Sequence, residues 1–276
     1  MRPIDGAAPR ERAINMPTGL LVAIGLLFAI QGIRSWLDDV TDLNLLVDLS
    51  FIPASWSAAF GWATPEEVVG AVGRDAADPQ SAFRVAWAQF VTAEGRAYPW
   101  TWLSYAVLHG SWTHVALNGV WLAAFGTPVV RRVGGLRSLV LAAATAIGGA
   151  TAQWIADPLS AQPMIGASAS VSGFMAAAAT FIFARRPESG MAAFQHLLPR
   201  RAGPDWSFLR HRSVLTFLAV WFAGNLLFGL IAVPLGIAEG AGIAWQAHIG
   251  GLVVGLLLFP FIDPGPAAEP PRGFGA

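Results

Sequence analysis

Six long apolar stretches restrict most strongly what this chain can fold into. They cover about residues 17–36, 100–126, 138–156, 164–184, 213–233 and 242–262. A helix needs roughly 20 apolar residues to cross a bilayer, and none of these stretches contains an acidic residue. Only 12% of the 276 residues are charged, against about 25% in soluble domains. We therefore expect an all-α polytopic membrane protein, with six spans in one bundle over residues 17–262.

The placement of arginine predicts how the spans are oriented. Four segments hold 13 of the 17 arginines, namely 1–16, 127–137, 185–212 and 263–276. The segments on the other side hold 11 of the 17 acids, most of them in a long first loop at 37–99. Because cytoplasmic loops are enriched in basic residues, we expect cytoplasmic tails at 1–16 and 263–276 and an outward-facing loop at 37–99.

One apolar segment of the first loop is too short to cross a membrane. It is FIPASWSAAFGWA, residues 51–63, and it contains two tryptophans. Tryptophan is enriched where membrane and water meet. The composition thus favours a segment that lies in the membrane interface.

Three further counts limit the chemistry. The chain has no cysteine, which excludes disulfides, thiolate metal ligands and a cysteine nucleophile. Its five histidines remain as candidates for acid–base work. The formal net charge is zero, and nothing in it indicates nucleic acid as a partner.

The fourth apolar stretch carries three serines near its start. It reads PMIGASASVSGFMAAAAT over residues 163–180, with Ser168, Ser170 and Ser172 in its first turns and Gly166 just before them. Free backbone N–H groups at a helix N-terminus favour negative charge, so a serine there is well placed as a nucleophile whose attack creates an oxyanion. The alternative is that small hydroxyl residues line a helix interface, where they let two backbones approach closely.

The sixth stretch offers a general base at the same predicted depth. His248 lies near its outer end, with Gly251 and Gly255 on the same helix face. This GxxxG pair permits close helix packing. The fourth stretch has a matching strip of small residues, Ser168, Ser172, Ala176 and Thr180. Close packing of the two strips predicts a hydrogen bond from a serine to His248, although a histidine satisfied in the core is the alternative.

The second stretch contributes a pair of hydrogen-bond donors. His114 and Asn118 are four residues apart in LHGSWTHVALNG, on one face, whereas His109 points elsewhere. Neutral donors aimed at a developing oxyanion are an effective catalytic device. The alternative is a polar pair that only joins helices.

Four stretches together resemble the rhomboid family of intramembrane serine proteases. They are HGSWTHVALNG, FGTPVVRRVG, GASASVSG and AHIGGLVVG, between Trp100 and Gly255. The resemblance implies a Ser–His dyad without a buried acid, with Ser168 as nucleophile and His248 as base. It implies an oxyanion hole of His114, Asn118 and the Ser168 N–H. It also implies supporting packing by Gly166, Gly173, Gly251 and Gly255.

The same resemblance implies the reaction and its setting. A rhomboid protease hydrolyses a peptide bond in single-span transmembrane proteins, near the outer leaflet, from a water-filled cavity. It uses no metal or organic cofactor, and its other partner is the lipid bilayer rather than nucleic acid. For a bacterial-type member the location is the inner (plasma) membrane.

Three residues depart from the family pattern. Ala169 follows the nucleophile, where glycine is usual, and Ser172 stands where an aromatic residue is often packed on the base. Thr101 follows Trp100, where arginine is common. These departures bear on base orientation and loop structure, and none removes a group that does chemistry.

Two other functions fit the sequence less well. A catalytically inactive rhomboid relative would bind membrane clients without cutting them, and labelling by a fluorophosphonate probe separates it from a protease. A small transporter would use polar groups at mid-membrane depth and often carries acids inside its spans. Uptake in proteoliposomes tests that alternative.

Overall fold

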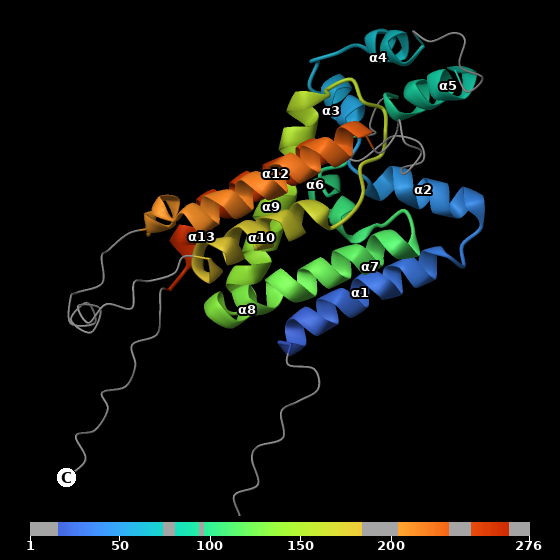
Figure 1. Cartoon of the computed structure of the whole chain (residues 1–276). Helices are drawn as coiled ribbons and strands as arrows, with labels where there is room; N and C mark the ends of the chain where they lie inside the picture. Colours follow the sequence, from blue (N-terminus) through green and yellow to red (C-terminus); the bar gives the residue numbers. More distant parts are fainter. Residues whose placement is uncertain (1–15, 74–80, 94–96, 184–203, 232–243, 265–276) are drawn as a thin grey trace, which may run out of the picture.

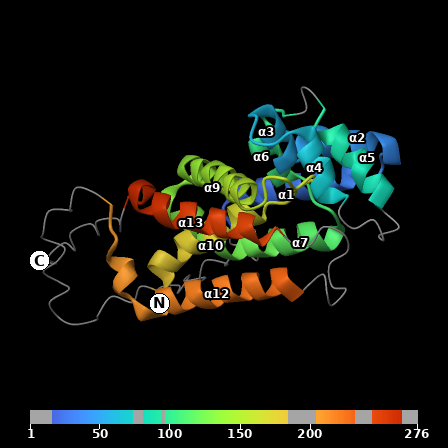
Figure 2. The same cartoon turned by 90° about the horizontal axis from the view of Figure 1, so that it is seen from above.

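The computed structural model describes residues 16–73, 81–93, 97–183, 204–231 and 244–264. These residues are helical, apart from turns and one isolated bridge between Phe51 and Met164. The longer helices form a bundle, and the short helices of the first loop gather at one end of it (Figures 1 and 2). The expected all-α class is confirmed for this part of the chain. Most of both predicted tails and of the basic segment after 184 lies outside the described residues.

Three helices form the centre of the bundle. They are α9 (Gly135–Ala156), α10 (Ser168–Ile182) and α13 (Trp245–Ile262), and each packs on the other two. Every residue of α10 from Ala169 to Thr180 is buried. A helix that is apolar all round is favoured in such a central position. Figure 2 shows α12 (Arg212–Ile231) running along the outside of this group.

The first two long elements lie side by side. Helix α1 (Thr18–Arg34) corresponds to the apolar stretch expected at 17–36. Helix α7 (Trp112–Trp121) packs along α1 (Figure 1). A Cβ atom added to Gly119 would lie 3.1 Å from the Phe28 ring, so the absence of a side chain there brings α7 close to α1.

The second apolar stretch differs from the continuous helix expected at 100–126. Its first part forms a short helix, α6 (Thr101–Ser104), and a 3₁₀ turn at Tyr105–Val107. The long helix starts only at Trp112, because the Ser111 hydroxyl accepts the His114 N–H at 3.1 Å and so caps a new N-terminus.

The expected end of the second stretch at residue 126 is wrong. Helix α7 continues through a π-helical turn, Leu122–Gly126, into α8 (Thr127–Val133). Pro128 lacks an N–H, and the wider π turn adjusts the backbone around it. The Thr127 hydroxyl donates to the Ala123 carbonyl at 2.6 Å, beside the bond from the Thr127 N–H to the same oxygen.

Among the described residues, two helices are long and apolar enough to cross a bilayer, α9 and α13. Helices α1 and α10 and residues Arg212–Leu227 of α12 are apolar but shorter. The six-span count therefore stays a prediction.

The expected first loop is itself largely helical. It contains α2 (Asp39–Leu49), α3 (Pro53–Ala59), α4 (Pro65–Val72) and α5 (Ser81–Val91). Most of its described acids lie at helix starts, where the helix dipole favours negative charge, namely Asp38, Asp39, Asp42, Glu66 and Glu67. Asp38 accepts the Thr41 N–H at the start of α2, and Thr64 and Glu67 form a capping box at α4.

Segment 51–63 belongs to the protein core at this end of the bundle. Phe51 and Trp56 are buried, and Trp56 lies edge-on to Trp102 with ring centroids 5.3 Å apart. Protein thus covers its first half, which differs from a segment lying in the membrane interface. Phe60 and Trp62 at its end are exposed.

Candidate active site

The start of α10 places Ser168 at the first position of a buried helix. The loop before it is pinned on both sides. Gly166 donates its N–H to the Tyr105 carbonyl at 2.9 Å, and Met164 exchanges two backbone hydrogen bonds with Phe51. Gly166 has φ of +118°, a conformation that favours glycine. These contacts fix the backbone that carries the serine.

Ser168 and His248 are in contact. The Ser168 Oγ lies 2.8 Å from Nε2 of His248, which sits in the first turn of α13. The two residues are 80 positions apart in the chain. This pair has the geometry that a nucleophile and its general base require.

Glycines allow α13 to approach α10 this closely. A Cβ on Gly251 would overlap the Ala169 carbonyl oxygen, and one on Gly255 would lie 2.5 Å from Gly173 Cα. Here the predicted packing strip is corrected. Ala169 and Gly173 face the glycines of α13, one position on from Ser168 and Ser172, because their small side chains let the backbones touch.

The other two serines of α10 serve its own packing. Ser172 donates its hydroxyl to the Ser168 carbonyl at 2.7 Å. Ser170 donates to the Ala142 carbonyl of α9 at 2.9 Å. Neither hydroxyl forms a hydrogen bond to His248 within the described residues.

Helix α9 makes room for the unusual Ala169. A Cβ on Gly149 would lie only 2.5 Å from the Ala169 methyl group. The missing side chain of Gly149 therefore accommodates the methyl group that Ala169 adds relative to the glycine usual in the family pattern. The departure at 169 has a structural compensation one helix away.

The His114 ring lies near Ser168. A Cβ on Gly166 would be 2.8 Å from Nε2 of His114 and 3.8 Å from the Ser168 Oγ. The Gly110 N–H donates to Nδ1 of His114 at a long 3.4 Å. With Nδ1 as acceptor, a neutral ring carries its proton on Nε2, on the side of Gly166.

Asn118 is buried one turn further along α7. Its Nδ2 donates to the His114 carbonyl at 3.0 Å, and the amide carries a second proton. Among the described residues no hydrogen bond joins Asn118 to Ser168. The structure brings His114 to the serine and holds Asn118 on its own helix.

His109 does not point elsewhere, contrary to expectation. It is buried, its ring centroid is 5.0 Å from that of His114, and its Nε2 accepts the Ala167 N–H at 3.4 Å. The helix break before Trp112 explains the difference, because the predicted i+5 spacing assumed one continuous helix.

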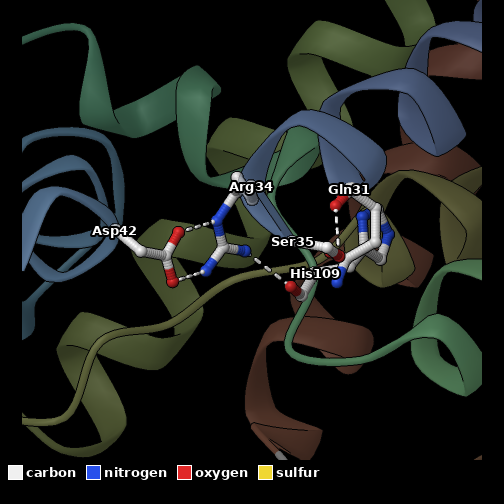
Figure 3. A network of polar contacts seen from close by, with 5 residues as sticks. All are labelled: Gln31, Arg34, Ser35, Asp42 and His109. Atoms are coloured by element: carbon white, nitrogen blue, oxygen red, sulfur yellow. Dashed lines mark hydrogen bonds and ion pairs between the residues drawn. The ribbon is translucent and has the colours of Figure 1, made fainter. Parts of the chain in front are cut away.

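Figure 3 shows the polar contacts that link the first loop to the segment around His109. Arg34 at the end of α1 donates to both carboxylate oxygens of Asp42, at 2.7 and 2.8 Å. A third bond from Arg34 reaches the His109 carbonyl at 2.6 Å. The segment that carries His109 is therefore tied to α1 and α2, which no local sequence pattern indicated.

Asn225 of α12 contacts His248, and the sequence alone did not bring this residue into the site. Its Oδ1 lies 2.7 Å from Nδ1 of His248, and its Nδ2 donates to the Trp221 carbonyl at 2.9 Å. Trp221 also approaches His248, with ring centroids 6.5 Å apart. A lone amide inside the apolar stretch 213–233 was the available signal, since polar groups within spans mark functional sites.

The described residues contain no group of three or more His, Asp or Glu side chains able to hold a metal ion. The groups gathered at Ser168 are a hydroxyl, two imidazoles and backbone N–H groups. Such a set can transfer protons, attack a carbonyl and stabilise an oxyanion.

The region that contains these residues also matches known proteins. A sequence profile described as "Rhomboid domain" matches residues 96–263. Rhomboid protease GlpG of Pectobacterium atrosepticum is 26% identical over 173 residues, which are 62% of this chain and 51% of that protein. Rhomboid protease GlpG of Serratia proteamaculans is 28% identical over 159 residues, 58% of this chain and 46% of that protein. The chain thus spans about half the length of these relatives.

Proposed function

This chain belongs to the rhomboid family and is an integral membrane protein, and on that premise we propose that it is an intramembrane serine endopeptidase. The observation that carries the proposal is the 2.8 Å contact between Ser168 Oγ and His248 Nε2 at the start of a buried helix. A serine hydroxyl becomes an effective nucleophile when an adjacent base accepts its proton.

In the proposed reaction, the Ser168 oxygen attacks the carbonyl carbon of the scissile peptide bond. His248 Nε2 takes the hydroxyl proton as the new C–O bond forms. The resulting imidazolium then gives this proton to the amine that leaves as the C–N bond breaks. Water repeats the sequence on the acyl-enzyme, with His248 as base again, and releases the acid product.

The oxyanion of each tetrahedral intermediate needs donors in place before it forms. We assign this role to the Ser168 N–H at the α10 N-terminus, to Nε2–H of His114, and to the Asn118 amide. The N-terminal N–H groups of a helix have no partner inside the helix and meet a favourable dipole. Asn118 reaches the oxyanion in this scheme with the amide proton that is not bonded to the His114 carbonyl.

The proposed substrates are single-span transmembrane proteins of the bacterial inner membrane, cut near the outer leaflet. A helical peptide hides its carbonyls in hydrogen bonds, so the cleaved segment has to unwind. Hydrolysis also requires water, which the hydrocarbon core does not supply. Both requirements favour a site near the outer surface, as expected for Ser168 if both termini are cytoplasmic.

The test is co-expression with a panel of single-span fusions, scored for a cleavage product. Ser168→Ala and His248→Ala should each abolish cleavage while the protein still folds, because each removes one half of the proton transfer. Ser170→Ala is the matched control on the same helix, since its hydroxyl bonds to α9 and away from His248.

Labelling of the purified protein by a fluorophosphonate probe tests independently whether Ser168 is the nucleophile. The parent and Ser170→Ala should label, and Ser168→Ala should not. Cleavage or labelling at the parent rate in Ser168→Ala would refute the assignment. A folded parent that neither labels nor cleaves would instead support an inactive client-binding protein.

A further inference from the structure

We infer that Asn225 is the positioning residue of His248, so that three helices supply a hydrogen-bonded chain of Ser168, His248 and Asn225. The inference rests on the proposed function, because Asn225 has this task only if His248 acts as the base. It departs from the dyad that the sequence resemblance implies. The third member is an amide on α12, 23 residues before the histidine.

The first step concerns the histidine proton. The Asn225 Oδ1 lies 2.7 Å from Nδ1 of His248, and an amide oxygen only accepts hydrogen bonds. Nδ1 must therefore carry the proton. A neutral imidazole has one such proton, which leaves Nε2 with its lone pair toward Ser168. This is the tautomer that a general base needs.

The second step concerns the orientation of the amide. Nδ2 of Asn225 donates to the Trp221 carbonyl, one turn earlier on α12, at 2.9 Å. A rotated amide would set Oδ1 against that carbonyl oxygen, with two acceptors facing each other. The helix backbone thus selects the orientation in which Oδ1 faces His248, and through it the tautomer.

The third step concerns the choice of a neutral residue. A carboxylate at this place would be a charge inside an apolar helix, which is costly in a bilayer. An amide orients the imidazole at lower cost, as asparagine does in the Cys-His-Asn arrangement of papain-like proteases. The hydrogen bond lies in partly buried surroundings, where it is stronger than in water.

Helix α12 also supplies an aromatic ring near His248, which the small side chain of Ser172 does not. That position holds a small hydroxyl bonded to its own helix, so it offers no aromatic ring to the base. Trp221 of α12 lies 6.5 Å from the His248 ring, one turn from Asn225. Orientation of the base thus comes from α12 in this chain.

Two substitutions separate positioning from packing. Asn225→Leu keeps a similar volume and removes the acceptor, whereas Asn225→Asp keeps an oxygen acceptor and adds charge. A lost hydrogen bond to a group that becomes charged corresponds to roughly 10-fold to 100-fold in rate. We expect that loss of kcat, and of the fluorophosphonate labelling rate, in Asn225→Leu, with KM changed by no more than about twofold.

Asn225→Asp should retain activity within about tenfold of the parent at neutral pH. A packing role predicts the reverse order, with the leucine variant active and the aspartate variant damaged. Leu227→Ala is the matched control, because Leu227 is 58% exposed on the same helix. An Asn225→Leu protein that labels and cleaves like the parent overturns the inference.

Nitrogen NMR of ¹⁵N-histidine-labelled protein reads the tautomer directly, with the His248 signals identified by their loss in His248→Ala. The parent and Asn225→Asp should show the Nδ1–H form, and Asn225→Leu a mixture. A parent that cleaves but shows the same mixture with and without Asn225 overturns the inference alone. A folded parent that neither labels nor cleaves overturns the proposed function, and the inference with it.

Discussion

At the scale of single residues, the site depends on where each proton sits. A backbone donor at His114 and a side-chain acceptor at His248 each select one tautomer of these two histidines. The Gly110 N–H faces Nδ1 of His114, and Asn225 Oδ1 faces Nδ1 of His248. One ring is thereby set as a donor and the other as an acceptor, the roles that an oxyanion and a serine hydroxyl require.

Asn118 gives a prediction that separates catalysis from helix packing. If its amide donates to the developing oxyanion, Asn118→Ala should lower kcat on the order of 10²-fold with little change in KM. His114→Ala should act in the same direction. Kinetics and melting temperature are measured together on both variants.

The structure also shows how this prediction can fail. The Asn118 amide donates to the His114 carbonyl within α7. If that bond is its whole contribution, Asn118→Ala will melt earlier and turn over normally when folded. This outcome would remove Asn118 from the oxyanion hole.

Gly166 gives a second prediction at this scale. Gly166→Ala places a methyl group 2.8 Å from Nε2 of His114, at a positive φ. We expect strain of roughly 1–3 kcal/mol, together with a loss of kcat beyond tenfold as the ring is displaced. Gly134→Ala is the control, because Gly134 has φ of +83° and a Cβ there meets nothing within 4 Å. Equal activity losses in the two folded variants would refute a specific role for Gly166.

At the scale of elements, small residues set the distance between helices. Gly149 receives the Ala169 methyl group, Gly251 lies on the Ala169 backbone, and a Cβ on Gly173 would overlap Thr145 of α9. In a membrane, packing and polar contacts hold helices together, because lipid is as apolar as the side chains. The contact from Ser168 to His248 therefore depends on glycines that do no chemistry.

Gly251→Ala tests this dependence. Its methyl group would overlap the Ala169 carbonyl oxygen, so α13 must move away from α10. We expect a destabilisation of roughly 1–3 kcal/mol and a loss of kcat of more than tenfold, measured by thermal melting and cleavage. Gly25→Ala in α1 is the control, because its Cβ would meet nothing within 4 Å. A Gly251→Ala protein with parental stability and rate would contradict this account of the packing.

At the scale of the whole molecule, two bidentate ion pairs tie helices together at opposite ends of the bundle (Figure 1). Arg34 pairs with Asp42 at the first loop, and Arg132 of α8 pairs with Asp263 just after α13, at 2.7 and 2.8 Å. Pairing neutralises charges that would be costly next to lipid. Paired charges thus join helices at both ends of the bundle, as suits residues near a membrane boundary.

The proposed topology predicts which end faces outward. The chain has no cysteine, so a single introduced thiol reports one position. Ala82→Cys, exposed on α5, should react with a membrane-impermeant maleimide on intact cells. Leu136→Cys, 77% exposed in the first turn of α9, should react only after permeabilisation. The opposite pattern would invert the topology and place the site at the cytoplasmic face.

The sequence by itself determined the helical class, the approximate positions of the long helices and the family resemblance. It also indicated Ser168 and His248 as candidate partners. Hydrophobicity and the i, i+4 spacing are local properties, so they can be read without knowing how helices pack. The end of the second stretch was misjudged because a π turn lets the helix pass Pro128, and a proline usually indicates a boundary.

Only the tertiary structure decided which residues meet across helices. The rotation of α10 against α13 follows from where two backbones can touch, and it turned Ala169 rather than Ser172 toward Gly251. The same packing brought Asn225 to His248 and joined Arg34 to the His109 segment. These contacts join residues far apart in the chain, and their partners are fixed by the shape of the whole bundle rather than by any local pattern.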